Sequence, residues 1–385
     1  MADNTTLRRA RLASSVSALN LQRGKAAVDA GMNVSGIRVY PLREPRSGRR
    51  YSVLKIMTES GLAGFGECEP VSSADLARAT QIVSGRPATA YEVIRQQLLP
   101  LPGLQAAVNV ALLDILGKKA KAPIYQVLGG PTRFKARASA VLEGETDEVL
   151  VTSLKRAQGL GFRAFLVPVP QVQARNQGQA FVQATRKRLD LLRSAGGDDA
   201  DFILDGAGSL SAGDASSLAH ELERFHLLWF DEPCRLSNLS ATRKIASETV
   251  TALGFGRHLH DAGAFQDLLR EELVDVLRPS LALNGISQIR RMAALAEAYY
   301  VAVAPHHNGG PIATAAALHL AASLPNFFIQ QIPLPVADED RRMRAELAGA
   351  SVERVTDGFA ALPAGVGLGI TINEDALEKY KERPA

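Results

Sequence analysis

Short apolar runs recur along the last two thirds of the chain. They are Ala138–Leu142, Ala164–Val169, Phe202–Leu204, Leu227–Phe230, Thr251–Leu253, Val274–Leu277 and Val301–Ala304. Helically spaced apolar residues separate most of them, as in Val149–Leu160, Phe181–Ser194, Ser216–Phe225 and Ile286–Tyr299. Alternation of buried strands with helices indicates a parallel sheet covered on both faces. Roughly seven or eight units favour a closed barrel. An open nucleotide-binding sheet would carry a glycine-rich loop after its first strand, and none is visible.

The residues before this alternation follow a different pattern. Val34–Tyr40, Tyr51–Met57 and Gly61–Glu67 predict an antiparallel meander, and Leu104–Lys118 predicts a helix that contains Asp114. Leu128-Gly129-Gly130-Pro131 is a stop signal. We therefore predict three parts: a poorly ordered N-terminal extension at 1–33, an α+β unit at 34–131 and a barrel at 132–356. The tail, 357–385, is expected to fold back onto the α+β unit.

Polar residues stand directly after three of the apolar runs. Asp205 follows one run, Asp231 and Glu232 end the next, and His306 and His307 follow the last. In a parallel barrel the chemistry lies at the carboxyl ends of the strands. These residues are therefore the first candidates for a functional site.

Composition removes several classes of function. Of 385 residues, 46% are hydrophobic and 22% charged, and the net charge of +4 is spread along the chain, which disfavours nucleic-acid binding. No apolar run reaches the roughly 18 residues of a membrane span. The two cysteines, Cys68 and Cys234, form no CxxC pattern. We expect a cytoplasmic protein. The alternative is twin-arginine export, since Arg8-Arg9 precedes a weakly apolar stretch.

Four groups of residues carry a resemblance to a known family. They are Met57-Thr58-Glu59-Ser60-Gly61 with Gly64-Phe65-Gly66-Glu67; Ala111–Lys118 with Pro123 and Leu128-Gly129-Gly130; Pro305–Ile312; and Pro363 with Gly367-Leu368-Gly369. Together they resemble the enolase superfamily, and within it the mandelate racemase and muconate lactonizing enzyme group with its sugar-acid dehydratases. The resemblance implies a (β/α)7β-type TIM barrel with an α+β capping domain built from both ends of the chain. It also implies proton abstraction beside a carboxylate and an enediolate held by Mg²⁺.

The resemblance also assigns metal ligands, but incompletely. It implies Asp205 and Asp231 as the first two ligands, with Glu232 as a fallback. The third position, usually a glutamate, holds Arg257. The Mg²⁺ ligand set is therefore incomplete. Two alternatives follow: either water fills the empty positions around the ion, or the guanidinium of Arg257 takes the place of the cation and bridges Asp205 and Asp231.

The implied proton-transfer groups are also only partly present. His306 matches the histidine after the seventh strand. Ser280 stands where its aspartate partner is expected, and Gln331 where a glutamate is expected after the eighth strand. The lysine pair of the second strand, which contains the usual base, is replaced by Leu166 and Pro168.

Two functions follow as expectations. The first is an Mg²⁺-dependent lyase, a dehydratase (or else a racemase), acting on a small carboxylic or sugar acid, with His306, Gln331 and Ser280 in the site. The second is a non-catalytic homologue in which Arg257 replaces the metal. A further alternative is zinc bound by His258, His260, His306 and His307. The cap loop around residues 43–50 is expected to contact the substrate, and the resemblance implies a homo-oligomer.

Overall fold

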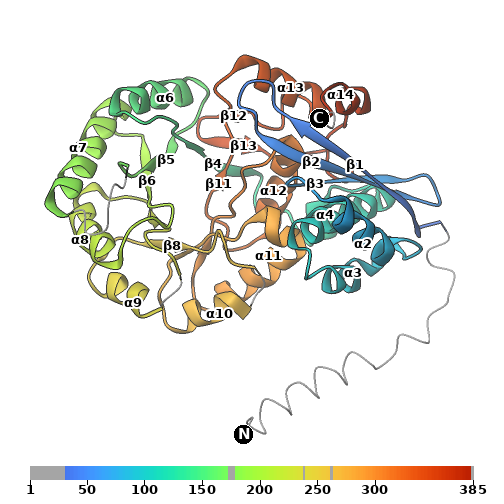
Figure 1. The fold of residues 1–385 in the computed structure, drawn as a ribbon, viewed down its shortest axis with the longest axis horizontal. Coiled ribbons are helices and arrows are strands. Elements are labelled where there is room, and N and C mark those ends of the chain that lie inside the picture. Colours follow the sequence, from blue (N-terminus) through green and yellow to red (C-terminus); the bar gives the residue numbers. More distant parts are fainter. Residues whose placement is uncertain (1–30, 172–177, 237–238, 261–262, 383–385) are drawn as a thin grey trace, which may run out of the picture.

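The computed structural model describes residues 31–171, 178–236, 239–260 and 263–382. The Arg8-Arg9 pair and almost all of the expected extension at 1–33 lie outside these described residues. The described chain forms a small α+β unit beside a larger β/α unit, as the blue and green-to-orange regions of Figure 1 show. None of the described helices is both long and apolar enough to cross a lipid bilayer.

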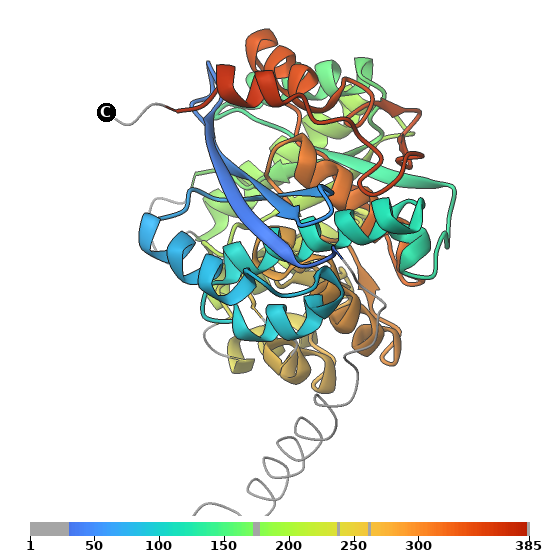
Figure 2. The ribbon, with the colours of Figure 1, turned by 90° about the vertical axis from the view of Figure 1, so that its right-hand side faces the viewer.

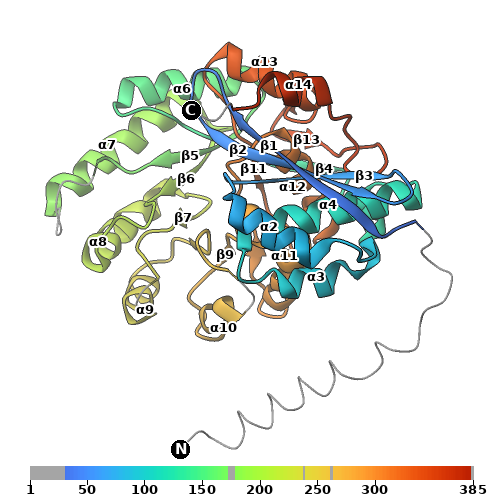
Figure 3. The ribbon, with the colours of Figure 1, turned by 45° about the vertical axis from the view of Figure 1, so that its right-hand side comes forward.

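The α+β unit, called the cap here, is an antiparallel sheet with helices on one face (Figure 3). Its strands are β1 (Val34–Arg43), β2 (Arg50–Thr58) and β3 (Ala63–Cys68), and its helical segments are α2 (Ser73–Val83), η1 (Ala88–Ala90), α3 (Tyr91–Gln97), α4 (Pro102–Ala120) and α5 (Ile124–Val127). Strand β3 lies close to α4 because its glycines leave room: a Cβ at Gly64 or Gly66 would overlap the carbonyl of Ala111 or Ala107. The meander and the long helix predicted from the sequence are confirmed.

The larger unit alternates strands and helices. The strands are β4 (Lys135–Val141), β5 (Ala164–Pro168), β6 (Asp201–Asp205), β7 (Phe230–Asp231), β8 (Leu253–Phe255), β9 (Val276–Leu277), β10 (Ala302–Val303) and β11 (Gln330–Gln331). The helices are α6 (Asp147–Gly159), α7 (Gly178–Gly196), α8 (Ala212–Leu222) with η2 (Glu223–Phe225), α9 (Leu239–Ser247), α10 (Gly263–Arg270), α11 (Leu281–Glu297), α12 (Pro311–Ser323) and α13 (Asp338–Ala348). Neighbouring strands from β4 to β10 pair in parallel.

The segment at 326–331 links the two ends of this sheet. On one side Phe328 donates its N–H to Val303 O of β10 and Val303 donates to Asn326 O. On the other side β11 pairs in parallel with β4. These bonds close the sheet into a barrel of the (β/α)7β type, which confirms the expected fold. Its interior is filled by a small apolar cluster that includes Leu166, Ile203 and Trp229.

Several strands differ in extent from the apolar runs that predict them. Strand β7 pairs only at the end of Leu227–Phe230, and β8 begins at the last residue of Thr251–Leu253. An apolar run reports burial, whereas a strand is bounded by its ladder of hydrogen bonds. The runs therefore locate the strands but not their ends.

The C-terminal tail contacts both units. Strand β13 (Phe359–Ala361) pairs with β12 (Val355–Thr356) and, antiparallel, with β4 of the barrel. Farther on, Leu368 donates its N–H to Asp114 Oδ1 in α4 at 2.8 Å. Helix α14 (Glu374–Lys379) lies beside β1 (Figure 2). The tail thus holds the cap against the barrel.

Candidate functional site

The guanidinium of Arg257 joins the two aspartates at the carboxyl ends of β6 and β7. Asp205 and Asp231 are neighbours in the sheet register. Arg257 stands just after β8, the strand that pairs with β7. Its Nη1 donates to Asp205 Oδ2 at 3.1 Å, and its Nη2 binds Asp205 Oδ1 and lies 3.3 Å from Asp231 Oδ2. The Arg257 side chain is only 12% exposed. A cation that belongs to the chain therefore bridges the two carboxylates.

A second arginine, Arg278, reaches the same aspartate from inside the barrel. Its Nε donates to Asp231 Oδ1 at 3.0 Å, and its Nη2 donates to Gln331 Oε1 at 3.2 Å. Trp229 Nε1 also donates to Asp231 Oδ1, at 2.8 Å. Arg278 is not among the site residues predicted from the sequence, although a signal was present: it stands directly after the apolar strand β9, as Asp205 ends β6.

Glu232 faces a different part of the mouth. Its carboxylate accepts hydrogen bonds from the backbone N–H groups of Gly256 and Arg257 at 2.7 and 2.8 Å. Burial, together with the negative charge of Asp231, raises the pKa of Glu232 above its usual range. Its contacts make Glu232 a support for the turn that carries Arg257.

These contacts test whether Mg²⁺ fits the residues present. Magnesium needs carboxylate oxygens facing an open position. Here Arg257 binds both oxygens of Asp205 and lies 3.3 Å from Asp231 Oδ2, Arg278 binds Asp231 Oδ1, and Glu232 Oε1 accepts two backbone amides. An ion placed there would also be repelled by Arg257. Within the described parts of the chain no three His, Cys, Asp or Glu residues are grouped so that they could hold a metal ion. The residues therefore do not fit Mg²⁺, and the same holds for the zinc alternative.

Leu166 and Pro168, at the positions of the lysine pair, contribute no polar side chain. Leu166 is buried in the apolar cluster that fills the barrel, and Pro168 ends β5. Neither side chain can accept a proton, so a base must come from another strand.

His306 is the titratable group at the carboxyl end of β10. Its backbone pairs with that of Ser280, but its Nδ1 has no hydrogen-bond partner among the described residues. Burial, reinforced by the positive charges of Arg278 and Arg257, holds the pKa of His306 well below its usual range. The imidazole is therefore neutral at pH 7.

Its neighbour His307 is held within the loop that follows. Nδ1 of His307 accepts the N–H of Gly309 at 3.2 Å, and Nε2 lies 3.3 Å from Thr314 Oγ1. Burial lowers the pKa of His307 to about 3. Gln331 supports the same loop, since its Nε2 donates to His307 O and to Asn308 Oδ1, both at 3.2 Å. His307 and Gln331 therefore shape the loop after β10.

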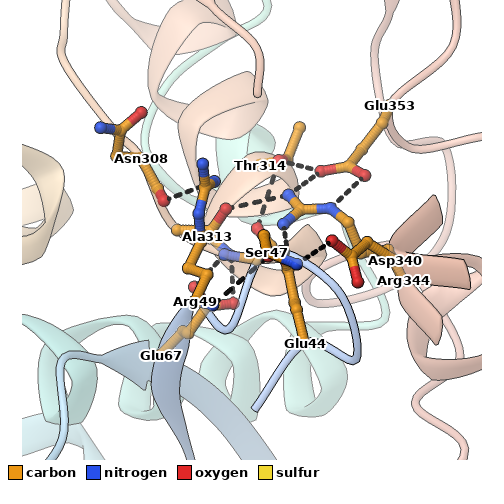
Figure 4. Close-up of polar contacts among 12 residues, drawn as sticks. Glu44, Ser47, Arg49, Glu67, Asn308, Ala313, Thr314, Asp340, Arg344 and Glu353 are labelled. Atoms are coloured by element: carbon orange, nitrogen blue, oxygen red, sulfur yellow. Dashed lines mark hydrogen bonds and ion pairs between the residues drawn. The ribbon is translucent and has the colours of Figure 1, made fainter. Parts of the chain in front are cut away.

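A cavity of about 410 Å³ lies between the cap and this loop, and we call it the cap–barrel cavity. Its wall includes Arg49, Tyr51 and Glu67 from the cap and Ser280 and His306 from the barrel. Arg49 Nη1 donates to Asn308 O at 3.1 Å, as Figure 4 shows. The loop around residues 43–50 thus reaches the barrel mouth, where the sequence analysis expects substrate contacts.

A buried arginine of α13 fixes the cap to the barrel beside this cavity (Figure 4). Arg344 donates from Nη1 to Glu44 Oε1 at 2.7 Å, from Nε to Glu353 Oε2 at 2.8 Å and from Nη2 to Gly309 O at 2.9 Å. Nearby, the carboxylate of Glu67 accepts the backbone N–H groups of Gly310 and Ala313 at the start of α12. The sequence analysis assigned no role to Arg344 or Glu67, because only the fold brings their partners together.

Comparison with known proteins agrees with this architecture. Residues 42–129 match the family described as mandelate racemase / muconate lactonizing enzyme, N-terminal domain, and residues 150–376 match the enolase C-terminal domain-like family. Proteins named D-galactonate dehydratase from Xanthomonas campestris pv. campestris (strain B100) and Pectobacterium atrosepticum are each 28% identical, over 87% of this chain and 92% of the relative.

Solved structures share the fold. The mandelate racemase/muconate lactonizing enzyme from Sulfitobacter sp. superposes with a TM-score of 0.82 at 23% identity, covering 92% of this chain and 96% of its own. The mandelate racemase/muconate lactonizing enzyme-like protein from Rubrobacter xylanophilus gives 0.82 at 21% identity, covering 92% and 98%. This chain belongs to the mandelate racemase / muconate lactonizing enzyme family of the enolase superfamily.

Proposed function

We propose that this protein is a lyase of the dehydratase type that acts on a small carboxylic or sugar acid in the cap–barrel cavity. One observation carries the proposal: the neutral imidazole of His306 stands in the wall of that cavity with Nδ1 unpartnered among the described residues. The relatives named D-galactonate dehydratase support the reaction class.

The proton balance of such a reaction needs one group that first accepts and then donates. The imidazole of His306 takes the proton next to the carboxylate, and the C–H electrons move into the carboxylate to give an enediolate. These electrons then return to form the new C=C double bond as the neighbouring C–O bond breaks. The imidazolium then gives its proton to the departing hydroxyl, which leaves as water. The lowered pKa of His306 keeps the acceptor form abundant but makes it a weak base, so we expect slow turnover.

The positive charge in this proposal comes from side chains. Arg49 lines the same cavity and stands ready to bind the carboxylate and the enediolate charge that develops on it. Arg257 and Arg278 neutralise the aspartates at the barrel mouth. No step is assigned to Mg²⁺, because Asp205, Asp231 and Glu232 are already engaged.

The test is a screen of 2,3-dihydroxy acids, sugar acids among them, for 2-keto acid product, with Mg²⁺ and with EDTA. We expect at least one acid to turn over in EDTA. His306→Ala should lower kcat by roughly 10²- to 10⁴-fold. The control, His220→Ala, removes a histidine that is 74% exposed on α8 and should leave kcat unchanged. No product from any acid, or equal kcat in His306→Ala, would contradict the proposal.

A second candidate function is a non-catalytic homologue that binds an acid without converting it. The observation that favours it is the combined loss of the lysine pair, at Leu166 and Pro168, and of the third metal carboxylate, at Arg257. The two candidates separate cleanly: this one predicts saturable binding of an acid by calorimetry with no product after long incubation.

Three further expectations are part of the proposal. The units at 34–131 with 357–385 and at 132–356 act as two domains, the protein forms a homo-oligomer, and it resides in the cytoplasm. Light scattering after size-exclusion chromatography measures the subunit number. A monomer at micromolar concentration would contradict the second expectation.

A further inference from the structure

We infer that the ligand of the cap–barrel cavity is a 2,3-dihydroxy acid whose body is otherwise apolar, such as an aryl- or branched 2,3-dihydroxyalkanoic acid, and not a polyhydroxylated sugar acid. The inference rests on the proposed function only in taking this cavity as the substrate site. It narrows the substrate class that the family leaves open.

The wall of the cavity is mainly hydrocarbon. Three helices supply it: Ala106 and Val110 come from α4, Leu281 from the start of α11, and Ile312, Ala313 and Ala316 from one face of α12. A hydroxyl buried against such side chains finds no hydrogen-bond partner, which costs roughly 1–3 kcal/mol for each group. A sugar acid carries a hydroxyl on almost every carbon, so this wall selects against it.

The cavity wall also contains two polar side chains that each have a buried atom without a hydrogen-bond partner among the described residues. Tyr51 lines the cavity, and the Tyr51 hydroxyl is buried without a partner among the described residues. His306 Nδ1 is likewise buried without a hydrogen-bond partner among the described residues. Buried polar atoms are rarely left unpaired in folded proteins. A ligand carboxylate that reached the Tyr51 hydroxyl would complete its hydrogen bonding, and the rest of the ligand would contact the apolar wall.

The charges at the cavity suit one anionic group. Arg49 and Arg50 line the cap side; Arg49 is fixed by its bond to Asn308 O, and Arg50 pairs with Glu382 at 2.8 Å. Two acids oppose them, Glu67 and the exposed Glu69. The carboxylate of Glu67 already binds the first turn of α12. Arg49 is therefore the group placed to receive the ligand's carboxylate.

The cavity volume agrees with a ligand of this class. About 410 Å³ falls within the roughly 300–1,000 Å³ of small-molecule sites. Such pockets are mostly apolar with a few polar groups that fix orientation, which matches the wall of helices α4, α11 and α12 around His306, Tyr51 and Arg49.

The test compares two acids that share one carboxylate and differ in the rest of the molecule. Binding of 3-phenylpropanoate and of D-galactonate to the full chain is measured by titration calorimetry in EDTA. We expect 3-phenylpropanoate to bind at least tenfold more tightly. Because the readout is binding, the result is independent of whether the protein turns over any acid.

Variants of two cavity residues test whether 3-phenylpropanoate binds in the cap–barrel cavity. Ala316→Leu fills the space beside α12, and Ala282→Asp adds a negative charge at the rim without enlarging the core. Each should weaken 3-phenylpropanoate binding at least tenfold. The control, Ala77→Leu, changes an exposed residue of α2 and should leave binding as in the wild type. Ala282→Asp keeps the test valid if Ala316→Leu does not fold.

Three outcomes would overturn the inference. They are D-galactonate binding as tightly as 3-phenylpropanoate or more tightly, absence of binding by both acids, and 3-phenylpropanoate binding that survives both cavity variants. The first outcome leaves the proposed lyase intact. Conversely, tight 3-phenylpropanoate binding without turnover of any acid supports the inference and contradicts the lyase.

Discussion

Nη2 of Arg257 lies 3.3 Å from Oδ2 of Asp231, and the same guanidinium binds both carboxylate oxygens of Asp205. These two aspartates stand where the family resemblance implies metal ligands, and the arginine stands where a third is implied. A fixed organic cation therefore bridges the two carboxylates at the mouth of the barrel, and Arg278 supplies the second positive charge.

Removing that cation should destabilise the fold. Arg257→Met leaves Asp205 without its guanidinium and Asp231 with Arg278 alone, and breaking a buried ion pair from one side costs about 3–5 kcal/mol. Urea denaturation at pH 7 measures the free energy of unfolding. The control is Arg270→Met, whose side chain is 61% exposed beside Asp267, with an expected loss below about 1 kcal/mol. Equal losses in the two variants would show that Arg257 carries no structural charge.

The low pKa of His306 makes its titration unusual. For an imidazole with an ordinary pKa near 6.5, the neutral fraction would fall roughly tenfold between pH 7.5 and pH 5.5. Burial beside Arg278 and Arg257 should instead keep His306 neutral at that pH. NMR titration of the imidazole resonances, assigned with His306→Ala, measures this directly. A His306 resonance that titrates near pH 6.5 would rule out the buried environment.

The contribution of Glu67 to folding stability should decrease as the pH rises. Burial raises the pKa of Glu67 to about 7, so the folded protein binds this proton more tightly than the unfolded chain does. Its contribution to stability is complete below pH 4.5 and is lost as the pH rises to about 7, on the order of 3 kcal/mol.

Comparison of the wild type with Glu67→Gln isolates the contribution of Glu67 to the free energy of unfolding. The variant keeps the side-chain volume but cannot titrate there, whereas buried histidines such as His307 and His319 titrate in both proteins. We expect the stability difference, wild type minus variant, to shrink from pH 5 to pH 8 in urea denaturation. A difference that is constant or grows with pH would show that Glu67 is charged when folded.

The Arg344 network should determine how firmly the cap is held. Its guanidinium joins Glu44 of the cap loop to Glu353 and Gly309 of the barrel, and its side chain is 1% exposed. Arg344→Met should lower the free energy of unfolding by about 3–5 kcal/mol and speed hydrogen exchange in residues 44–50. Arg46→Met, which removes an exposed pair with Glu339, is the matched control. Unchanged exchange in Arg344→Met would contradict a clamp.

The sequence predicts the fold well because burial leaves a periodic trace. The apolar runs locate β4 to β10. The closing strand β11 is two glutamines that follow the apolar run Phe327-Phe328-Ile329, and that run is not among those from which the strands are predicted. The ends of β7 and β8 are also not predicted, because the hydrogen bonds to neighbouring strands determine where a strand ends and the composition of the run does not.

The site is predicted less completely. Position after an apolar strand identifies Asp205, Asp231 and His306, and that same rule applied to β9 would have found Arg278. Glu232 follows the same strand end as Asp231, yet its carboxylate faces the turn of Gly256 because side chains alternate along a strand. Glu67 and Arg344 bind partners that are far away in the chain, and no local sequence pattern predicts such contacts.

The measurement that tests the account most directly is calorimetric titration of the wild-type protein with Mg²⁺, beside Asp205→Asn. The account predicts no saturable heat in either protein, because Arg257 already fills the position between Asp205 and Asp231. Saturable Mg²⁺ binding by the wild type that disappears in Asp205→Asn would contradict it.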